Sequence, residues 1–155
     1  MEPRLNFRQL SPEAARAMAG LEAVLHNCGL EASILEFVHL RASQINGCAY
    51  CIDMHTKDMR AAGETEQRLY LLDAWRESPF YSDRERAALE WTEALTLVSE
   101  TRVPDEVYER VRPHFTPQEL VNLTLAVVAI NGWNRFSIAF RSEPGKYVAK
   151  KHAAG

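Results

Sequence analysis

The 155-residue sequence has few of the features that mark secreted, membrane-spanning or nucleic-acid-binding proteins. Its first ten residues, MEPRLNFRQL, contain no apolar stretch of the kind found in secretory signals. No run approaches the roughly 18 consecutive apolar residues of a membrane-spanning helix. The formal net charge is -3, so the chain lacks the basic field that attracts nucleic acid. We therefore expect a cytoplasmic protein that binds neither membranes nor nucleic acid.

Cysteine is also scarce. The chain has three cysteines, Cys28, Cys48 and Cys51, and an odd number argues against a framework of structural disulfides. In a reducing cytoplasm, the C-x-x-C spacing of Cys48 and Cys51 indicates either a redox pair or half of a metal site. Attachment of a c-type haem is excluded, because Ile52 rather than a histidine follows the second cysteine.

The sequence lacks the alternating polar and apolar pattern of β-strands, and no hairpin signal stands between two β-like runs. Internal repeats and low-complexity segments are absent as well. Apolar residues recur at helical spacing instead. The length is that of one domain, and a hydrophobic fraction of 46% is enough for an ordinary core. We predict a single all-α domain over residues 1–155, with a tail after about residue 143 that is ill-ordered or lies on a neighbour.

Residues that are typical of helix starts and helix ends predict where the helices lie. Proline at the first helical position opens two helices, and capping boxes begin at Ser82 and Thr116. The apolar run that follows Glu119 is read as a helix because of its length and start signal, and Asn131 and Gly132 are predicted to interrupt it. The predicted helices cover residues 12–27, 32–44, 48–62, 65–75, a stretch from 82 onward, a short one after 104, 117–130 and a segment after 132.

Residues 36–55, EFVHLRASQINGCAYCIDMH, carry the most distinctive chemistry of the chain. Asn46 and Gly47 are poor residues for a helix interior and common ones at a break between helices. We therefore predict a tight turn there and a new helix that starts at about Cys48. The unpaired N–H groups and the dipole of its first turn would favour the thiolate form of Cys48.

Cys48, Cys51 and His55 fall at positions i, i+3 and i+7 of this helix and so share one face. Two such thiols can close and reopen a disulfide, with the thiolate as the reactive form. His55 is placed to accept or pass a proton. Because the turn is short, the preceding helix folds back and brings Glu36 to the thiols as a buried carboxylate with a raised pKa. We expect Glu36, Cys48, Cys51 and His55 to form a proton-relay dithiol centre.

Structural interpretations stand beside this one. A zinc site needs four ligands, which the three cysteines and His55 could supply, although the usual second C-x-x-C or H-x-x-x-H is absent. His55 alone reads as a half-buried helix histidine. Glu36 is also the fourth residue of a capping box that would begin at Ser33. Cys28, before a helix-ending glycine, is expected to be an inert packed thiol.

Two further groups receive no chemical role from the sequence. His39 and Arg41 are read as residues that cover a surface. The segment 133–135, Trp-Asn-Arg, is compatible with a core position and a helix cap or with an interface.

The pattern E-x11-C-x2-C-x3-H, with SQINGC leading into the cysteines, resembles the AhpD-like alkylhydroperoxidase branch of the carboxymuconolactone decarboxylase family. The segment INGWNRFSIAFR, residues 130–141, is similar to the WNR segment of many single-domain members. The resemblance covers about residues 21–141. It implies an all-helical fold and homo-oligomers, commonly trimers or hexamers built from dimers. It implies no cofactor, whether metal, flavin or haem.

The resemblance also implies a peroxiredoxin-type antioxidant enzyme, whose dithiol reduces hydroperoxides and is re-reduced by a protein or lipoyl dithiol. On this chain Cys51 would attack the peroxide, Cys48 would close the disulfide, and His55 and Glu36 would relay the proton. This order reverses the dipole argument for Cys48, because a base one turn beyond Cys51 outweighs a dipole contribution of about 1 kcal/mol.

The chain departs from the AhpD enzyme itself, which has two similar halves in a longer chain. That enzyme has a histidine just before the second cysteine, whereas this chain has Tyr50, and a phenol is a poor base near neutral pH. The decarboxylase branch needs no C-x-x-C, so the motif argues against that activity. Two alternatives to a peroxidase remain: a redox sensor or disulfide-exchange protein, and a non-redox binding protein on the same scaffold.

Overall fold

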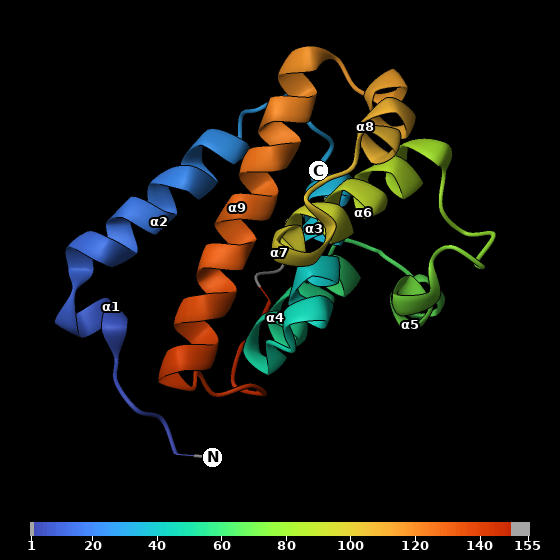
Figure 1. The fold of residues 1–155 in the computed structure, drawn as a ribbon. Coiled ribbons are helices and arrows are strands. Elements are labelled where there is room, and N and C mark those ends of the chain that lie inside the picture. The colour runs from blue at the N-terminus through green and yellow to red at the C-terminus, as the bar shows by residue number, and fades with distance from the viewer. Residues whose placement is uncertain (1, 150–155) are drawn as a thin grey trace.

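The computed structural model describes residues 2–149, and every regular element in that range is a helix, as predicted (Figure 1). The α-helices are α1 (Phe7–Leu10), α2 (Pro12–Leu25), α3 (Ala32–Asn46), α4 (Ala49–Ala61), α5 (Glu66–Tyr70), α6 (Asp83–Thr96), α7 (Val98–Thr101), α8 (Asp105–Val111) and α9 (Pro117–Phe140). Two short 3-10 helices, η1 (Leu72–Ala74) and η2 (Arg112–His114), follow α5 and α8. The predicted helix over residues 65–75 is thus divided between α5 and η1.

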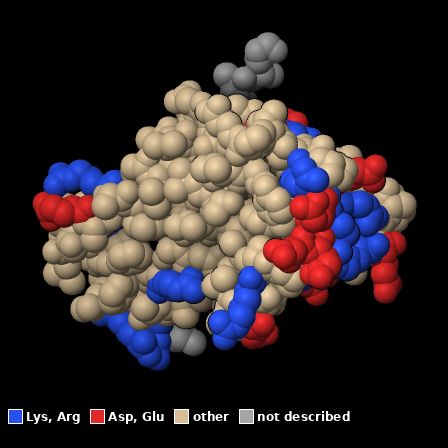
Figure 2. Space-filling view, turned by 45° about the horizontal axis from the view of Figure 1, so that its top comes forward, with Lys and Arg blue, Asp and Glu red and all other residues tan. Residues whose placement is uncertain are grey.

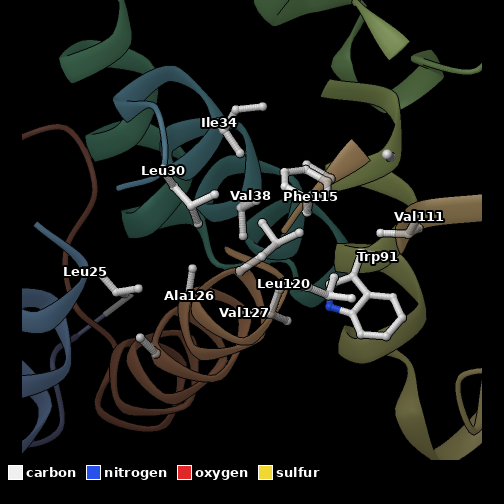
Figure 3. Packing of buried hydrophobic residues seen from close by; sticks show 14 residues of the cluster. Leu25, Leu30, Ile34, Val38, Trp91, Val111, Phe115, Leu120, Ala126 and Val127 are labelled. Carbon is white, nitrogen blue, oxygen red and sulfur yellow. The ribbon is translucent and has the colours of Figure 1, made fainter. Parts of the chain in front are cut away.

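Helix α3 lies at the centre of the fold and packs against α4, α6 and α9. Helix α9 also packs against α2, and Figure 1 shows these two helices side by side. One hydrophobic cluster joins α3 to α6 and α9 (Figure 3), and a second joins α3 to α4, η1 and α6. Val38 belongs to the first cluster, and Phe37 and Leu40 belong to the second. Apolar residues of α3 therefore pack into two separate hydrophobic clusters.

The predicted interruption at Asn131 and Gly132 is wrong, because α9 is continuous from Pro117 to Phe140. The side chain of Asn131 donates to the carbonyl of Val127, one turn earlier on the same helix, at 2.9 Å. Gly132 serves close packing: a Cβ atom there would lie 2.6 Å from Cε of Met18 on α2. The glycine therefore marks the close approach of two helices and not the end of one.

Local signals correctly placed the starts of α6 and α9. Capping boxes are present at the start of α6, between Ser82 and Glu85, and at the start of α9, between Thr116 and Glu119. In each, the hydroxyl accepts from the backbone N–H three residues later, and the glutamate accepts from the N–H of the cap. These bonds depend on four consecutive residues, which is why sequence alone suffices to find them.

The described part of the tail lies on α4 of its own chain. The backbone N–H of Gly145 donates to Asp53 at 2.9 Å, and the hydroxyl of Tyr147 lies 2.8 and 2.9 Å from the two carboxylate oxygens of Asp58. Lys57 donates to the carbonyl of Tyr147 at 2.9 Å. Residues 144–149 therefore contact a neighbouring helix of the same chain, and the rest of the predicted tail lies outside the described residues.

By length and composition, α9 is the one helix among residues 2–149 that could cross a membrane. It packs against α2, α3 and α6. The core helix of a soluble protein has the same length and composition, so this match is weak evidence for a membrane span.

Candidate active site

The turn that leads into the C-x-x-C motif has the predicted geometry. Gly47 caps α3 in the left-handed conformation, with φ of +67°. Its N–H donates to the carbonyl of Gln44, and the N–H of Cys48 donates to that of Ser43 at 2.9 Å. These two bonds close the end of α3, and Cys48 becomes the N-cap of α4. Cys48 thus lies one residue before the helix that was predicted to start with it.

The sulfur atoms of Cys48 and Cys51 are at disulfide distance, and their Cα atoms are 5.4 Å apart. Both residues are only 1% exposed, yet they face different hollows. Cys51 lines a pocket of about 260 Å3 between α3, α4 and α9. Cys48 lines a second one of about 440 Å3, beside the end of α9, and Tyr50 lines both. The dithiol can therefore be approached from two sides.

Glu36 reaches the site from α3, as the sequence predicted. Nδ1 of His55 lies 2.9 Å from Oε2 of Glu36, and both residues line the same pocket as Cys51. The capping alternative for Glu36 is wrong, because α3 begins at Ala32 with Glu31 as its N-cap. Ser33 lies inside the helix, where its side chain cannot cap the first turn.

The predicted raised pKa of Glu36 is wrong. Burial by itself raises the pKa of this carboxyl. The hydrogen bond and charge of His55, together with the charge of His39, outweigh burial and leave the pKa of Glu36 below its usual value. Glu36 is therefore ionised at neutral pH and accepts the hydrogen bond from His55.

His39 belongs to the pocket and not to the surface, contrary to the sequence interpretation. It is 6% exposed, and its ring centroid lies 5.0 Å from that of His55. Burial, followed by the nearby charge of His55, lowers the pKa of His39 to about 4. The spacing of Glu36 and His39, i and i+3 on one helix, was the signal that would have found it.

Arg41 is also not a surface residue. Its side chain is 12% exposed, and its Nε donates to Glu93 of α6 at 2.8 Å. A further ion pair joins the guanidinium to Asp73 of η1. Arg41 therefore ties α3 to α6 and η1 on the side of α3 that faces away from the dithiol pocket.

Glu22 of α2 brings a second carboxyl group to the pocket. The indole N–H of Trp133 on α9 donates to it at 3.0 Å. Burial raises the pKa of Glu22 and outweighs the hydrogen bond from Trp133 and the charge of His55, which lower it. No sequence pattern indicated Glu22 as a pocket residue, because α2 and α9 contact each other only in the folded chain.

The WNR segment supplies core and pocket residues. Asn134 is fully buried and joins α9 to the end of α3: its amide accepts from Asn46 at 2.8 Å and donates to the hydroxyl of Ser43 at 3.0 Å. Ser43 in turn donates to the carbonyl of His39 at 2.7 Å. Arg135 is exposed and bonds the carbonyl of Asn131 on its own helix. The network holds the last turn of α3, from which Gly47 and Cys48 follow directly.

A group of potential metal ligands lies close together, but it differs from the zinc ligands considered from the sequence, which were the three cysteines and His55. Glu36, His39 and His55 each offer one ligand atom, and these atoms lie within 4.8 Å of one another. Cys28 is absent from this group and packs against the main hydrophobic cluster instead, which agrees with the prediction of a packed thiol.

Comparison with known proteins relates the chain to one family. The model of the carboxymuconolactone decarboxylase family matches residues 12–94, which is more than half of the chain. The uncharacterised protein YdfG of Bacillus subtilis is 47% identical over 139 residues, which cover 90% of this chain and 95% of YdfG.

Two further proteins connect the chain to AhpD. A crystal structure of a protein of unknown function from Agrobacterium tumefaciens, for which an antioxidant defence role of the AhpD type has been suggested, is 44% identical. It superposes with a TM-score of 0.91 over 94% of this chain and 100% of that one. The alkyl hydroperoxide reductase AhpD of Bradyrhizobium diazoefficiens is 41% identical over 46 residues, or 30% of this chain and 25% of that protein.

Proposed function

Because the chain is an AhpD-like member of the carboxymuconolactone decarboxylase family, we propose that it is a thiol-dependent peroxidase that reduces hydroperoxides through Cys48 and Cys51. The family includes decarboxylases, so membership alone leaves the reaction open. One observation carries the proposal: Cys51 lines the same pocket as the hydrogen-bonded pair of His55 and Glu36. A nucleophilic thiol, a base and a group that orients the base are the parts that thiol catalysis needs.

The reaction begins with the reduced protein. Cys51 loses its proton to His55, and the thiolate attacks the terminal oxygen of ROOH. The O–O bond breaks, the alkoxide takes the proton and leaves as ROH, and Cys51 becomes a sulfenic acid. Cys48 then attacks this sulfur, the Cys48–Cys51 bond forms, and hydroxide leaves with the thiol proton as water. The sum is ROOH plus two thiols giving ROH, water and a disulfide.

Glu36 determines which ring nitrogen of His55 carries the proton and which one can act as the base. An ionised carboxylate only accepts hydrogen bonds, so Nδ1 of His55 must carry a proton and donate it toward Glu36. Nε2 is then the basic nitrogen, and it has no hydrogen-bond partner among the described residues. This is the arrangement in which a carboxylate orients an imidazole and stabilises its protonated form.

The second half of the cycle needs a reductant, which we propose to be a protein or lipoyl dithiol. Cys48 is 1% exposed but lines the hollow of about 440 Å3 beside the end of α9. A slender dithiol arm can enter such a hollow and attack the disulfide from the side away from Glu36. A cytoplasmic location is part of this proposal, since the cycle requires a compartment that supplies reduced dithiols.

We further propose that the protein acts as a homo-oligomer, a trimer or a hexamer. Figure 2 shows a broad central area almost without charged side chains, with Lys, Arg, Asp and Glu gathered at the two ends and along the lower edge of the view. Exposed apolar residues along α9 include Val121, Val128 and Ile138. A second copy that covered such a surface would remove it from water. Sedimentation velocity tests this, and a monomer at micromolar concentration would contradict it.

The deciding experiment combines a thiol count with a peroxide assay. Reduced protein receives one equivalent of cumene hydroperoxide, and free thiols and intact mass are then measured. Wild type and the matched control Cys28→Ser are expected to lose two thiols, with the mass of one internal disulfide. Cys51→Ser is expected to consume no peroxide. Unchanged peroxide consumption by Cys51→Ser would remove it as the nucleophile, and thiols that stay free in wild type would refute the peroxidase.

Tyr50 favours a second candidate, a redox sensor or disulfide-exchange protein. Its side chain lines the pocket of Cys51 at the position where AhpD has a histidine, and phenols in general are poor bases compared with imidazoles. Such a protein would form the Cys48–Cys51 bond once with peroxide but would not turn over. Steady-state consumption of hydroperoxide with excess dithiol separates the two, since only the enzyme reaches many turnovers per chain.

A further inference from the structure

Two histidines on the inner wall of the pocket have ring nitrogens without partners. His39 and His55 are both more than nine-tenths buried. Three of their ring nitrogens have no hydrogen-bond partner among the described residues: Nδ1 and Nε2 of His39 and Nε2 of His55. Buried polar atoms are nearly always paired, so unpaired nitrogens on two neighbouring histidines indicate a ligand that binds one nitrogen of each ring. The proposed peroxidase uses only one of the three, Nε2 of His55.

The chemistry of the group indicates what that ligand is. Imidazole nitrogens and carboxylate oxygens are the usual protein ligands of zinc and related divalent ions. Glu36 places a carboxylate beside the two imidazoles, and the three ligand atoms lie within 4.8 Å of one another. We propose that Glu36, His39 and His55 form a binding site for a divalent transition-metal ion, with Zn2+ as the representative.

The geometry fits such an ion after a small adjustment. Ligand atoms about 2.0–2.1 Å from a tetrahedral zinc lie roughly 3.4 Å from each other. The three ligand atoms lie within 4.8 Å of one another, so the side chains need to converge by no more than about 1.4 Å. Glu36 and His39 come from α3, and His55 comes from α4, which packs directly against α3. Rigid, adjacent helices hold the three residues close to the required positions.

The surroundings complete the site. The pocket of about 260 Å3 leaves room for a fourth ligand from solution. One carboxylate with two neutral imidazoles carries one negative charge, and Glu22 brings a second carboxyl to the same pocket. None of the three ligands is a thiol, so the site persists when Cys48 and Cys51 are joined. This distinguishes it from a zinc site built on the C-x-x-C motif.

Metal binding has a consequence that depends on the proposed function. An ion bound by His55 and Glu36 occupies the imidazole lone pair and neutralises the carboxylate charge, and proton transfer in the proposed peroxidase depends on both. Zinc would therefore act as a reversible inhibitor of peroxide turnover. The metal site itself does not depend on the peroxidase, because it is measured in protein whose dithiol is oxidised.

The experiment uses full-length Cys28→Ser protein, stripped of metal with a chelator and oxidised so that no thiol is free. Zn2+ is titrated in by calorimetry, and Co2+ by absorption spectroscopy. We expect one equivalent of Zn2+ per chain. We also expect visible Co2+ bands of a nitrogen and oxygen site, without the intense near-ultraviolet absorption of thiolate ligands. In the same background, His39→Leu should weaken binding at least tenfold, while the matched control His114→Leu, outside the pocket, should leave it unchanged.

Two results would overturn the proposal. One is the absence of 1:1 binding in the oxidised Cys28→Ser protein when circular dichroism shows that it is folded. The other is equal affinity in the His39 and His114 variants. Should His39→Leu fail to fold, Glu36→Gln carries the test, because it keeps the size of the side chain and removes its charge. Glu36→Gln with wild-type affinity would then contradict the assigned ligand set.

Discussion

The buried amide of Asn134 offers a quantitative test of how α9 holds the end of α3. Asn134→Ala removes two buried hydrogen bonds, one of 2.8 Å with Asn46 and one of 3.0 Å with Ser43. Asn46 keeps its bond to Asn131, and Ser43 keeps its bond to the carbonyl of His39, so neither partner is left without a bond. Each hydrogen bond contributes about 1 kcal/mol net, and the small cavity adds to their loss, so the free energy of unfolding should fall by about 3 kcal/mol.

For a chain of this length, a loss of about 3 kcal/mol lowers Tm by about 6–12 °C. Urea unfolding followed by circular dichroism measures the free energy directly. Gln118→Ala is the matched control, since Gln118 is an exposed amide on the same helix and its loss should cost less than about 0.5 kcal/mol. A double-mutant cycle with Ser43→Ala should return a coupling of about 1 kcal/mol. Equal effects of Asn134→Ala and Gln118→Ala would refute the reasoning.

Two further predictions concern carboxylates. Glu36→Gln removes the negative charge beside His55, so peroxide turnover at pH 7 should fall about tenfold or more. The Tm should change by less than about 3 °C. A variant that loses turnover because it no longer folds would make Glu36 a structural residue. For Glu93, burial raises the pKa, but hydrogen bonds from Trp75 and two arginines, with the charge of one of them, leave it lowered. A lowered pKa contributes stability above the unfolded value near 4.3, and this contribution is lost as the pH falls through the folded value. The difference in Tm between wild type and Glu93→Gln should therefore shrink between pH 7 and pH 3, and a constant difference in thermal melts would contradict it.

The sequence by itself determined the features that depend on neighbouring residues. The capping boxes at Ser82 and Thr116 and the left-handed turn at Gly47 need only a few consecutive residues, and all three are present. The helical spacing of the C-x-x-C motif and His55 also follows from one element, α4. The all-α fold and the family could be predicted for the same reason, because both rest on local periodicity and on motif spacing.

Only the tertiary structure decided what depends on contacts between helices. From the sequence, Gly132 is predicted to break the helix, but in the folded chain the side chain of Met18 on α2 packs closely against this glycine. From the sequence, His39 is read as a surface residue, although it shares a helix face with Glu36, because His55 of α4 approaches it only in the folded chain. The direction of the pKa shift of Glu36 depended on the balance between burial and the charge of His55, and the two act in opposite directions. A sequence places such groups on helices, whereas their ionisation is set by the neighbours that packing brings to them.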